Sequence, residues 1–575
     1  MRNKQIKEVL SSAKTDRRIL SHVPDPFQVR GKDDRRNAFT KDQKVAHSKE
    51  PGKRFLAQFP VKVRSKKGAL RATSIDVSQS GILLKAATAQ EYERLSGMDD
   101  ATLSFRIPPG AMEEGMEKKP LIIRAAKIRT LPEEQAVAYA FEKPMSRYFR
   151  ARETVYATIA FAALLLISLV AMLLRAESLF FFRFNRITAV YSVVTGVYLL
   201  SRYLFGSFYR PVKVDEDYTP GVTIIIPCYN EQEWIDRTIT NALDQDYPAD
   251  KLEVLIVDDK STDNSLEVIE RTLEHLFKEG ERFSVRERVR LLKQPKNAGK
   301  RHAMAWGVKE ARHELVVFVD SDSFLEPDAI RNLVQPFKDE KIAGVSGRTD
   351  VANTFTNNLT RMQSVRYYVA FRVMKAAEAV FDGVTCLSGP LACYRKSVML
   401  EHLDDWLDQQ FLGQRATFGD DRSMTNFMLR NHRTNYQDTA VAFTIVPSNY
   451  SVFFKQQMRW KRSWLRESFI AAGFMWKKEP FMSLSFYFGM VITILSPIIV
   501  LYNAVYVPLA LGQVPVVFLV GIMLMSMMTS FAQLFLRRST TWLHGILYNL
   551  FYVAVLIWQM PIAWFTFWRS NWGTR

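Results

Sequence analysis

Two carboxylates separated by one residue stand directly after an apolar run in the central part of the chain. They are Asp320 and Asp322, which follow Leu315–Val319. Carboxylates at this spacing can face one hard cation if the turn between them bends. Mg²⁺ or Mn²⁺ held by a few carboxylates keeps positions open for the oxygens of a diphosphate. Helix capping is the alternative role of such residues. Asp320 and Asp322 are therefore candidate metal ligands.

Three apolar runs that end in polar residues are typical of buried parallel strands alternating with helices. The runs are Val222–Ile226, Leu252–Val257 and Leu315–Val319. Because ligands of such sheets bind at the carboxyl ends of the strands, the polar residues there should meet at one edge. Those that follow the first two runs are Tyr229, Glu231, Asp258 and Asp259. Residues from about 214 to 450 are therefore predicted to form an α/β domain with a ligand site.

Two further motifs in this region carry charges suited to chemistry at a phosphate. Asn297–Arg301 joins a glycine to Lys300 and a second cation, which can bind phosphate, although a solvated basic turn is the usual identity of such a run. Gly419–Arg422 contains an acidic pair ahead of a helix expected to begin near Ser423. One of its carboxylates could act as a general base that takes a proton from an attacking hydroxyl, and a helix N-cap is its alternative role.

The stretch Gln456-Gln-Met-Arg459-Trp460 combines amides, a cation and an indole where the polar region gives way to apolar sequence. Arg459 can hold phosphate oxygens, and Trp460 can stack on a sugar ring. The alternative is an amphipathic helix in the membrane interface with Trp and Arg as anchors. A helix is expected from about Trp460 to Lys478.

Apolar runs near the length of a membrane span occur on both sides of the α/β region. They lie at about 155–174, 187–205, 481–506, 514–536 and 543–568. The net charge of +19 can therefore be assigned largely to the cytoplasmic flanks of spans, and nucleic acid is not needed to explain it. The first apolar segment lies far from Met1, so no signal peptide is expected and the N-terminus is predicted to be cytoplasmic.

The ordered motifs from about Pro220 to the C-terminus resemble those of processive family 2 glycosyltransferases, most closely the hyaluronan and chitin synthase branch. The segments that carry the resemblance are Pro227–Glu231, Asp258-Asp259, Asn297–Arg301, Asp320–Asp322, Ser388–Pro390, Gly419–Arg422, Gln456–Trp460 and the extension Lys461–Glu467. The resemblance implies a GT-A catalytic domain that uses a nucleotide-diphosphate sugar, most simply a UDP-sugar.

The same resemblance assigns roles to individual residues. Tyr229, Glu231, Asp258 or Asp259 and Gln456 would hold the donor, with Lys300 near its diphosphate. Asp320 and Asp322 would engage the donor and a metal, Mg²⁺ or Mn²⁺, and Asp421 would be the general base. Arg459 would steady the departing diphosphate and Trp460 would form the floor under the acceptor sugar. An inverting transfer needs a base on the acceptor side and positive charge opposite it, which fits this set.

The C-terminal end gives two conflicting expectations. Arg537 and Arg538 favour a cytoplasmic loop, so three spans would place Asn571–Arg575 outside. This ending, however, resembles a Trp-Gly-Thr-Arg segment that related synthases keep on the cytoplasmic side. A re-entrant last segment, or a break near Pro561, would reconcile the two.

Short alternating runs between Arg54 and Phe141 predict a small β-barrel or sandwich. Asp76-Val-Ser78-Gln-Ser-Gly81 within it is suited to a plain turn between two strands. The segment also resembles the cyclic di-GMP motif of PilZ domains, in which an upstream pair of arginines takes part. Arg54 stands at the expected place, but Gln58 replaces the second arginine. Cyclic di-GMP is therefore a candidate ligand of Arg54, Asp76, Ser78 and Gly81.

These observations predict a multidomain chain with a PilZ-like β-barrel, a GT-A domain and an α-helical transmembrane bundle. The expected boundaries are a mobile basic leader at 1–50, the barrel at 51–150, a transmembrane hairpin at 151–210, the GT-A domain at 211–455, the interfacial segment at 456–480, and membrane helices with a tail at 481–575. We expect a multi-pass protein of the cytoplasmic (inner) membrane that polymerises a sugar and translocates the growing polysaccharide. The alternatives are a non-processive membrane glycosyltransferase and a catalytically inactive cyclic-dinucleotide receptor or scaffold.

Overall fold

A computed structural model describes residues 54–569, except 57, 67, 79–80, 109–119, 133–134, 144, 146–185, 280–284, 538 and 540. Three predicted segments lie outside the described residues: the leader at 1–50, the first apolar run at 155–174 and the C-terminal Asn571–Arg575.

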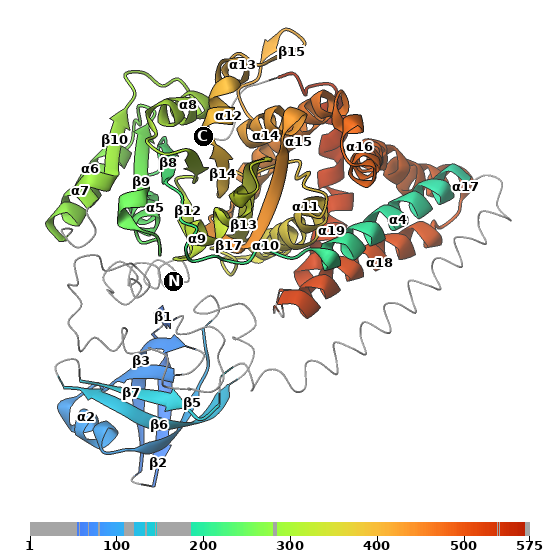
Figure 1. Cartoon of the computed structure of the whole chain (residues 1–575). Coiled ribbons are helices and arrows are strands. Elements are labelled where there is room, and N and C mark those ends of the chain that lie inside the picture. Colours follow the sequence, from blue (N-terminus) through green and yellow to red (C-terminus); the bar gives the residue numbers. More distant parts are fainter. Residues whose placement is uncertain are drawn as a thin grey trace.

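The N-terminal part is an antiparallel sheet that closes on itself (Figure 1). Its strand order is β1-β3-β2-β5-β6-β7-β4, and β4 also pairs with β3, which completes the ring. Inward-facing apolar residues fill the ring, and helix α2 covers one side through the buried Leu95. The elements are β1 (Arg54–Leu56), β2 (Pro60–Ser65), β3 (Gly68–Ser78), β4 (Gly81–Lys85), α2 (Ala89–Ser96), β5 (Asp100–Phe105), β6 (Leu121–Leu131) and β7 (Ala136–Phe141).

An eight-stranded mixed sheet with the order β10-β9-β8-β11-β14-β13-β17-β12 forms the centre of the chain. The three apolar runs form β8, β9 and β11, and β8 pairs in parallel with both of the others, as predicted. Every residue of β8 and β9 is buried, because helices cover both faces of the sheet. The strands are β8 (Val222–Cys228), β9 (Leu252–Asp258), β10 (Val289–Lys293), β11 (Leu315–Phe318), β12 (Ser323–Leu325), β13 (Ile342–Val351), β14 (Ala392–Arg395) and β17 (Arg433–Thr444).

Two buried apolar clusters, one on each face, hold the helices to this sheet. The first contains side chains of α5 and α6, and the second contains those of α8, α12, α13 and α14. The helices of the domain are α5 (Ile235–Leu243), η3 (Ala249–Lys251), α6 (Ser265–Glu279), α7 (Val285–Arg288), α8 (Lys300–Glu310), α9 (Ala329–Leu333), η5 (Gln335–Lys338), α10 (Asn358–Val369), η6 (Ala370–Lys375), α11 (Ala376–Ala379), α12 (Lys396–Glu401), α13 (Leu403–Leu407) and α14 (Asp420–Asn431); a short hairpin pairs β15 (Gln410–Phe411) with β16 (Gln414–Arg415).

Helix α14 begins earlier than the sequence suggested. The prediction placed its start near Ser423, but the helix begins at Asp420 because Gly419 takes a left-handed conformation, with a φ of 80°, and turns the chain into the helix. Both residues of the acidic pair therefore lie in its first turn.

Helix α15 (Tyr450–Ala472) contains the whole Gln456–Trp460 stretch in its middle. The predicted helix began at Trp460, whereas the observed one begins ten residues earlier, at Tyr450, after Asn449 caps it by accepting from the Ser451 N–H. Helix α15 packs against two helices from different parts of the chain, α14 and α20 (Gln559–Trp564).

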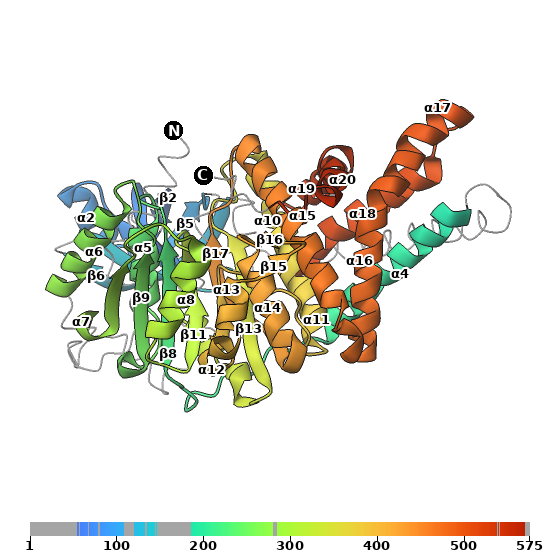
Figure 2. The same cartoon turned by 90° about the horizontal axis from the view of Figure 1, so that it is seen from above.

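The apolar helices gather on one side of the α/β domain, away from β9 and α6 (Figure 2). They are α4 (Arg186–Phe208), α16 (Pro480–Leu501), η8 (Tyr502–Tyr506), α17 (Val507–Leu511), α18 (Val516–Ala532), η9 (Gln533–Arg537) and α19 (Leu543–Ala554), and the 3₁₀ turn η7 (Met475–Lys477) precedes α16. Among the described residues, the continuous helical stretch Pro480–Leu511 is long and apolar enough to cross a membrane.

The last apolar run does not form one straight helix. It consists of α19, the 3₁₀ turn η10 (Leu556–Trp558) and α20, and the two helices differ in direction by 41°. The break lies at Val555, six residues before Pro561, where a break was expected. The Lys461 ammonium of α15 donates to the Leu556 carbonyl at 2.7 Å, so α15 is bonded to the chain directly after the break.

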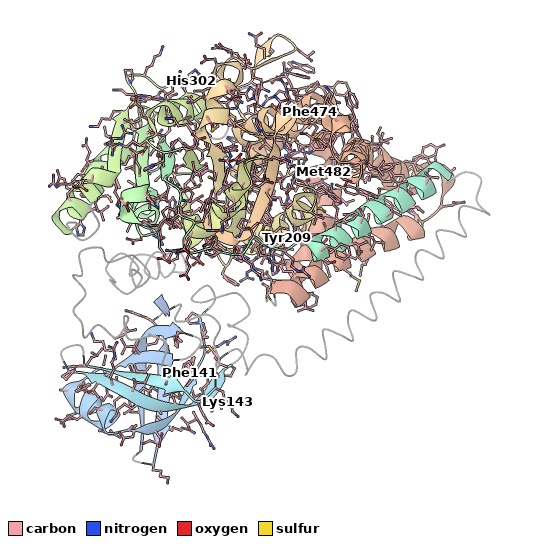
Figure 3. The ribbon with its side chains drawn as sticks, viewed as in Figure 1. Phe141, Lys143, Tyr209, His302, Phe474 and Met482 are labelled. Carbon is pink, nitrogen blue, oxygen red and sulfur yellow. The ribbon has the colours of Figure 1, made fainter. Side chains whose placement is uncertain are left out.

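Ion pairs and hydrogen bonds join the apolar helices to the eight-stranded sheet. Arg537, at the end of η9, lies 3.4 Å from Asp350 of β13. Tyr209, directly after α4, donates to the Tyr436 carbonyl of β17 at 2.7 Å and accepts from the Asp438 N–H (Figure 3). The apolar helices and the sheet are therefore bonded through both β13 and β17.

Candidate active site

The loops after β8 and β9 are bonded to each other, and together they form one wall of the site. Asn230 has a positive φ of 55°, and its side-chain oxygen accepts from the Thr262 N–H at 2.8 Å. The Glu231 N–H donates to the Ser265 hydroxyl at 2.7 Å. These bonds fix the backbone on both sides of Tyr229 and Glu231, and both side chains line the central cavity.

The two neighbouring aspartates at the end of β9 differ in position. Asp259 lines the cavity, whereas Asp258 does not and instead accepts from the Ser261 N–H. Each oxygen of Asp259 accepts one backbone N–H at 2.8 Å, from Ala298 and Gly299. Burial raises the pKa of Asp259 above its ordinary value despite these two donors. Asp259 thus anchors the loop that leads into Lys300.

Lys300 is the first residue of α8, and its ammonium lies 2.5 Å from an oxygen of Asp320. Gly299 precedes it with a φ of 92°, a conformation that favours glycine and aims Lys300 into the cavity wall. Burial lowers the pKa of Lys300, but Asp320 and the more distant Asp420 and Asp421 raise it by more, so it ends above its ordinary value. The side chain is a fixed cation beside the carboxylate pair.

Asp320 and Asp322 both line the cavity just beyond β11, as the sequence predicted for the edge of the sheet. Asp322 accepts from the Thr444 hydroxyl of β17 at 3.4 Å. Beside Asp320, a side chain on Gly389 would come within 3.2 Å of both carboxylate oxygens, so only glycine leaves this flank of the carboxylate open.

The carboxylate pair fits a cation that also needs oxygens from a ligand. Among the described residues no group of three or more acidic, histidine or cysteine side chains is arranged to hold a metal. Mg²⁺ is commonly held by one or two carboxylates together with substrate phosphates, and Mn²⁺ also prefers oxygen ligands. Asp320 and Asp322 would hold such an ion, which when bound would neutralise charge on a diphosphate.

Asp421 lines the same cavity from the first turn of α14. Its carboxylate accepts from the Arg422 N–H at 2.8 Å and from the Cys386 thiol at 3.5 Å. The thiol remains protonated in this position, because burial raises the pKa of Cys386 to about 11, with Asp421 adding to the shift. Asp421 keeps acceptor capacity toward the cavity.

Gln456, Arg459 and Trp460 of α15 also line the cavity. Arg366 of α10 supports this part of α15, since its guanidinium donates to Gln457 at 2.7 Å and lies 5.6 Å from the centre of the Trp460 ring. Within the described part of the chain, the Gln456 side-chain oxygen is buried and has no hydrogen-bond partner. A ligand donor would satisfy it.

One cavity of about 1300 Å³ brings these side chains together. It extends from Tyr229 and Asp259 past the carboxylate pair to Trp460, and then to Thr493 of α16, Tyr552 of α19 and Met560 of α20. It is thus lined both by the loops of the α/β domain and by the apolar helices. All the predicted catalytic and donor-binding residues except Asp258 line it.

The structure adds residues that the sequence did not single out. Lys375 of η6 lines the cavity and donates to the hydroxyls of Ser346 and Ser388 at 2.9 and 2.7 Å. Arg366 and Cys386 line it as well. Arg366 and Lys375 lie in a helical region without any recognisable motif, so no signal in the sequence singled them out.

The turn predicted to bind cyclic di-GMP belongs to the barrel. Ser78 closes the turn between β3 and β4, because its hydroxyl donates to the Gly81 carbonyl and accepts from the Gly81 N–H. A side chain on Gly81 would lie 2.6 Å from the Tyr139 carbonyl. The register of β1 with β3 places Arg54 opposite Ser78 and Leu56 opposite Asp76. The backbone thus brings Arg54 to the turn, and the turn is itself internally bonded.

The arrangement in the cavity suits transfer of a group from a diphosphate to a hydroxyl. Lys300, Arg459 and a cation on the carboxylate pair would offset negative charge that develops on a leaving diphosphate. A carboxylate at Asp421 can accept a proton from an attacking hydroxyl on the opposite side. The Trp460 ring provides a flat apolar surface of the kind on which sugar rings stack.

Comparison with known proteins agrees with this chemistry. Residues 223–403 match the family described as glycosyl transferase family 2. The chain is 35% identical over 285 residues to a hyaluronan synthase of Streptococcus pyogenes, and this match covers 49% of this chain and 66% of that protein. It is 36% identical over 257 residues to an N-acetylglucosaminyltransferase of Mesorhizobium japonicum, and this match covers 44% of this chain and 58% of that protein. The chain therefore spans less than two thirds of the length of these relatives.

Solved structures resemble the chain less closely. A mannosyltransferase of Pyrobaculum calidifontis in complex with GDP-mannose and Mn²⁺ has a TM-score of 0.44 and 20% identity, over 64% of this chain and 98% of that one. At this score the likeness adds no argument. The family match falls on the central α/β domain, whose cavity lies at the carboxyl ends of β8 and β11, and it supports a glycosyltransferase domain of family 2 there.

Proposed function

We propose that the protein is a membrane-embedded, inverting processive β-glycosyltransferase, which extends a polysaccharide from a nucleotide-diphosphate sugar and passes the polymer between its own helices. The observation that carries the proposal is the single cavity that reaches from the donor-side carboxylates to α16, α19 and α20. A hydrated sugar chain cannot cross lipid unaided, so an enzyme that keeps and extends its product needs such a path.

In this proposal the acceptor sugar rests on Trp460, and Asp421 takes the proton from its attacking hydroxyl. The oxygen attacks the anomeric carbon of the donor as the bond to the diphosphate breaks, and the nucleoside diphosphate leaves. Lys300 and Arg459 stabilise the charge on the leaving group. Tyr229, Glu231 and Asp259 hold the nucleotide part, and the unpartnered Gln456 oxygen accepts from a hydroxyl of the bound sugar.

Mg²⁺ or Mn²⁺ would be held by Asp320 and Asp322 together with the donor diphosphate. The donor is proposed to be a UDP-sugar, because the similar proteins are named hyaluronan synthase and N-acetylglucosaminyltransferase. UDP-N-acetylglucosamine, alone or with UDP-glucuronate, is the first choice, and UDP-glucose is the next.

Exposed apolar stripes support the proposed location in the cytoplasmic membrane. On α16, side chains that are 39 to 60% exposed recur every three or four residues: Phe481, Leu484, Phe488, Val491, Leu495, Ile498 and Leu501. Helix α4 carries a similar stripe, 41 to 58% exposed: Val190, Val193, Val197, Leu200 and Leu204. Apolar faces of this length are stable against lipid and costly in water. We propose several spans, with the catalytic domain and barrel on the cytoplasmic side.

We also propose that the barrel is a PilZ-like domain whose β3–β4 turn binds cyclic di-GMP and regulates the enzyme. The support is the proximity of Arg54 to the turn through the pairing of β1 with β3. Titration of the purified protein should show binding that is lost in Asp76→Ala and kept in Asp100→Ala, a control on β5. Failure of the wild type to bind would leave the barrel with a structural or partner-docking role.

A panel of sugar donors supplied to membrane vesicles with Mg²⁺ or Mn²⁺ tests the main proposal. We expect one UDP-sugar, or one pair, to give polymer, and Asp421→Asn to give none. If no donor releases a nucleoside diphosphate, the proposal of an enzyme is wrong, and the receptor or scaffold alternative takes its place.

A further inference from the structure

We propose that Gln409 and Glu467 are positioning residues for the transfer step. They form the centre of a buried polar cluster that fixes the first turn of α14, which carries Asp421, against helix α15. The inference rests on the proposed glycosyl transfer and adds to it residues that lie behind the reacting groups. Neither Gln409 nor Glu467 is among the residues that line the cavity, so neither touches a substrate there.

The Glu467 carboxylate is completely buried, with 0% of its side chain exposed. It accepts from the Arg466 guanidinium at 2.8 Å, from the Gln409 amide at 3.2 Å and from the Asn426 amide at 3.0 Å. A buried charge is costly unless it is paired and hydrogen-bonded, and these three donors provide both. Because Glu467 lies on α15 and Asn426 on α14, the carboxylate bonds the two helices to each other.

Gln409 connects the same cluster to a third helix. Its side-chain oxygen accepts from the Ser423 hydroxyl of α14 at 2.6 Å and from the Arg301 guanidinium of α8 at 3.3 Å. Arg301 also donates to Asp420 at 2.9 Å, and both of these side chains are buried. Arg301 directly follows Lys300, so the cluster reaches from the diphosphate side of the site to the helix of the base.

The loop ahead of α14 is held against α15 as well. Arg466 donates to the Phe418 carbonyl. The next residue, Gly419, approaches α15 so closely that a Cβ there would lie 1.9 Å from the Ser463 hydroxyl. The start of α14 is therefore fixed from α15 at the loop, through Arg466, and inside the helix, through Glu467.

Asp421 itself is not hydrogen-bonded to α15. Within the described part of the chain, the hydrogen bonds that its carboxylate accepts come from the N–H of the neighbouring Arg422 and from the Cys386 thiol. The distance between Asp421 and the acceptor floor at Trp460 is thus set through the cluster. A displacement of about 1 Å in reacting groups can slow a transfer about a hundredfold.

The test exchanges the amide and the carboxylate of the central pair. Glu467→Gln removes the charge and presents an amide where three donors converge. Gln409→Glu in the same chain supplies a carboxylate that can accept from the amide introduced at position 467, from Arg301 and from Ser423. We expect Glu467→Gln to lower the kcat of sugar transfer at least about tenfold, with the KM for the donor and the affinity for UDP within about threefold of wild type. The double variant should regain at least about threefold of the lost kcat.

The rates are normalised to the number of UDP-binding sites, so a loss of folded protein does not count as a loss of kcat. Glu401→Gln, on the exposed end of α12, is the matched control and should behave as wild type. A normalised kcat within about twofold of wild type in Glu467→Gln, or a double variant no faster than the single one, would overturn the positioning role. If the wild type itself transfers no sugar, the proposed function fails first, and this inference fails with it.

Discussion

Gly419→Ala tests how closely the loop of the candidate base approaches α15. Gly419 has a φ of 80°, and a Cβ would lie 1.9 Å from the Ser463 hydroxyl and 2.9 Å from its Cβ. A left-handed backbone costs an L-residue about 1–2 kcal/mol. Overpacking a tight contact adds about 1–3 kcal/mol. The substitution should therefore destabilise this region by about 2–5 kcal/mol in total.

The two contributions can be separated by shortening the residue on the other side of the contact. Ser463→Ala removes the hydroxyl, so in the Gly419→Ala background it should relieve part of the overpacking and leave the backbone cost. Alone, Ser463→Ala should change stability by less than about 1 kcal/mol. The assay is the temperature of half-inactivation of UDP binding by the purified protein, measured for the wild type, both single variants and the double variant.

The expected order of half-inactivation temperatures is wild type close to Ser463→Ala, then the double variant, then Gly419→Ala. A double variant no more stable than Gly419→Ala would show that the contact with Ser463 does not limit the approach. If Gly419→Ala were as stable as wild type, the account of the loop against α15 would be wrong.

Three further predictions concern the metal, the pKa of a buried lysine, and the difference between a buried and an exposed ion pair. Chelation of divalent cations should abolish sugar transfer, and added Mg²⁺ or Mn²⁺ should restore it. Asp322→Asn should raise the metal concentration needed for half-maximal transfer by about tenfold. Full activity in excess chelator would contradict the role of the carboxylate pair. Burial lowers the pKa of Lys375 to about 8, from an ordinary 10.5, so between these pH values the unfolded chain binds more protons than the folded chain. The free energy of unfolding should therefore rise with pH in this range for the wild type, compared with Lys375→Met. Parallel curves of stability against pH for the two proteins would refute this. Asp438→Asn should lower the free energy of unfolding by about 3–5 kcal/mol, because this carboxylate is buried beside Arg372. Asp408→Asn, in a pair whose side chains are more than half exposed, should lower it by less than about 1 kcal/mol. Thermal denaturation compares the two variants, and equal losses of stability would contradict the account.

The strands that position the donor side could be predicted because their signal is local. Each of β8, β9 and β11 is an apolar run followed by polar residues, and parallel pairing places those ends at one edge. In Asn297–Arg301, which was predicted as a phosphate-binding motif, Gly299 takes a positive φ directly before α8. The placement of Asp258 outside the cavity could not be predicted, because two adjacent residues at a strand end point in different directions.

The apolar helices were harder to predict, because their limits depend on distant contacts. The last apolar run is hydrophobic on both sides of Val555, and no glycine or proline next to Val555 marks it as the break. The bend is accompanied by the bond from Lys461, which lies almost one hundred residues earlier in the chain. The cluster around Glu467 is hidden for the same reason, since Gln409, in the loop after α13, and Asn426 of α14 reach it from distant parts of the sequence.

Product length measures the central claim most directly, because the claim is that one cavity carries both the reaction and the growing chain. Wild-type protein in membrane vesicles is given radiolabelled donor for a few turnovers per enzyme and then for many, and the products are sized. The account predicts long polymer that remains bound while it grows, with few short intermediates even at early times. Short, discrete products released at every time point would contradict it and would favour a non-processive transferase.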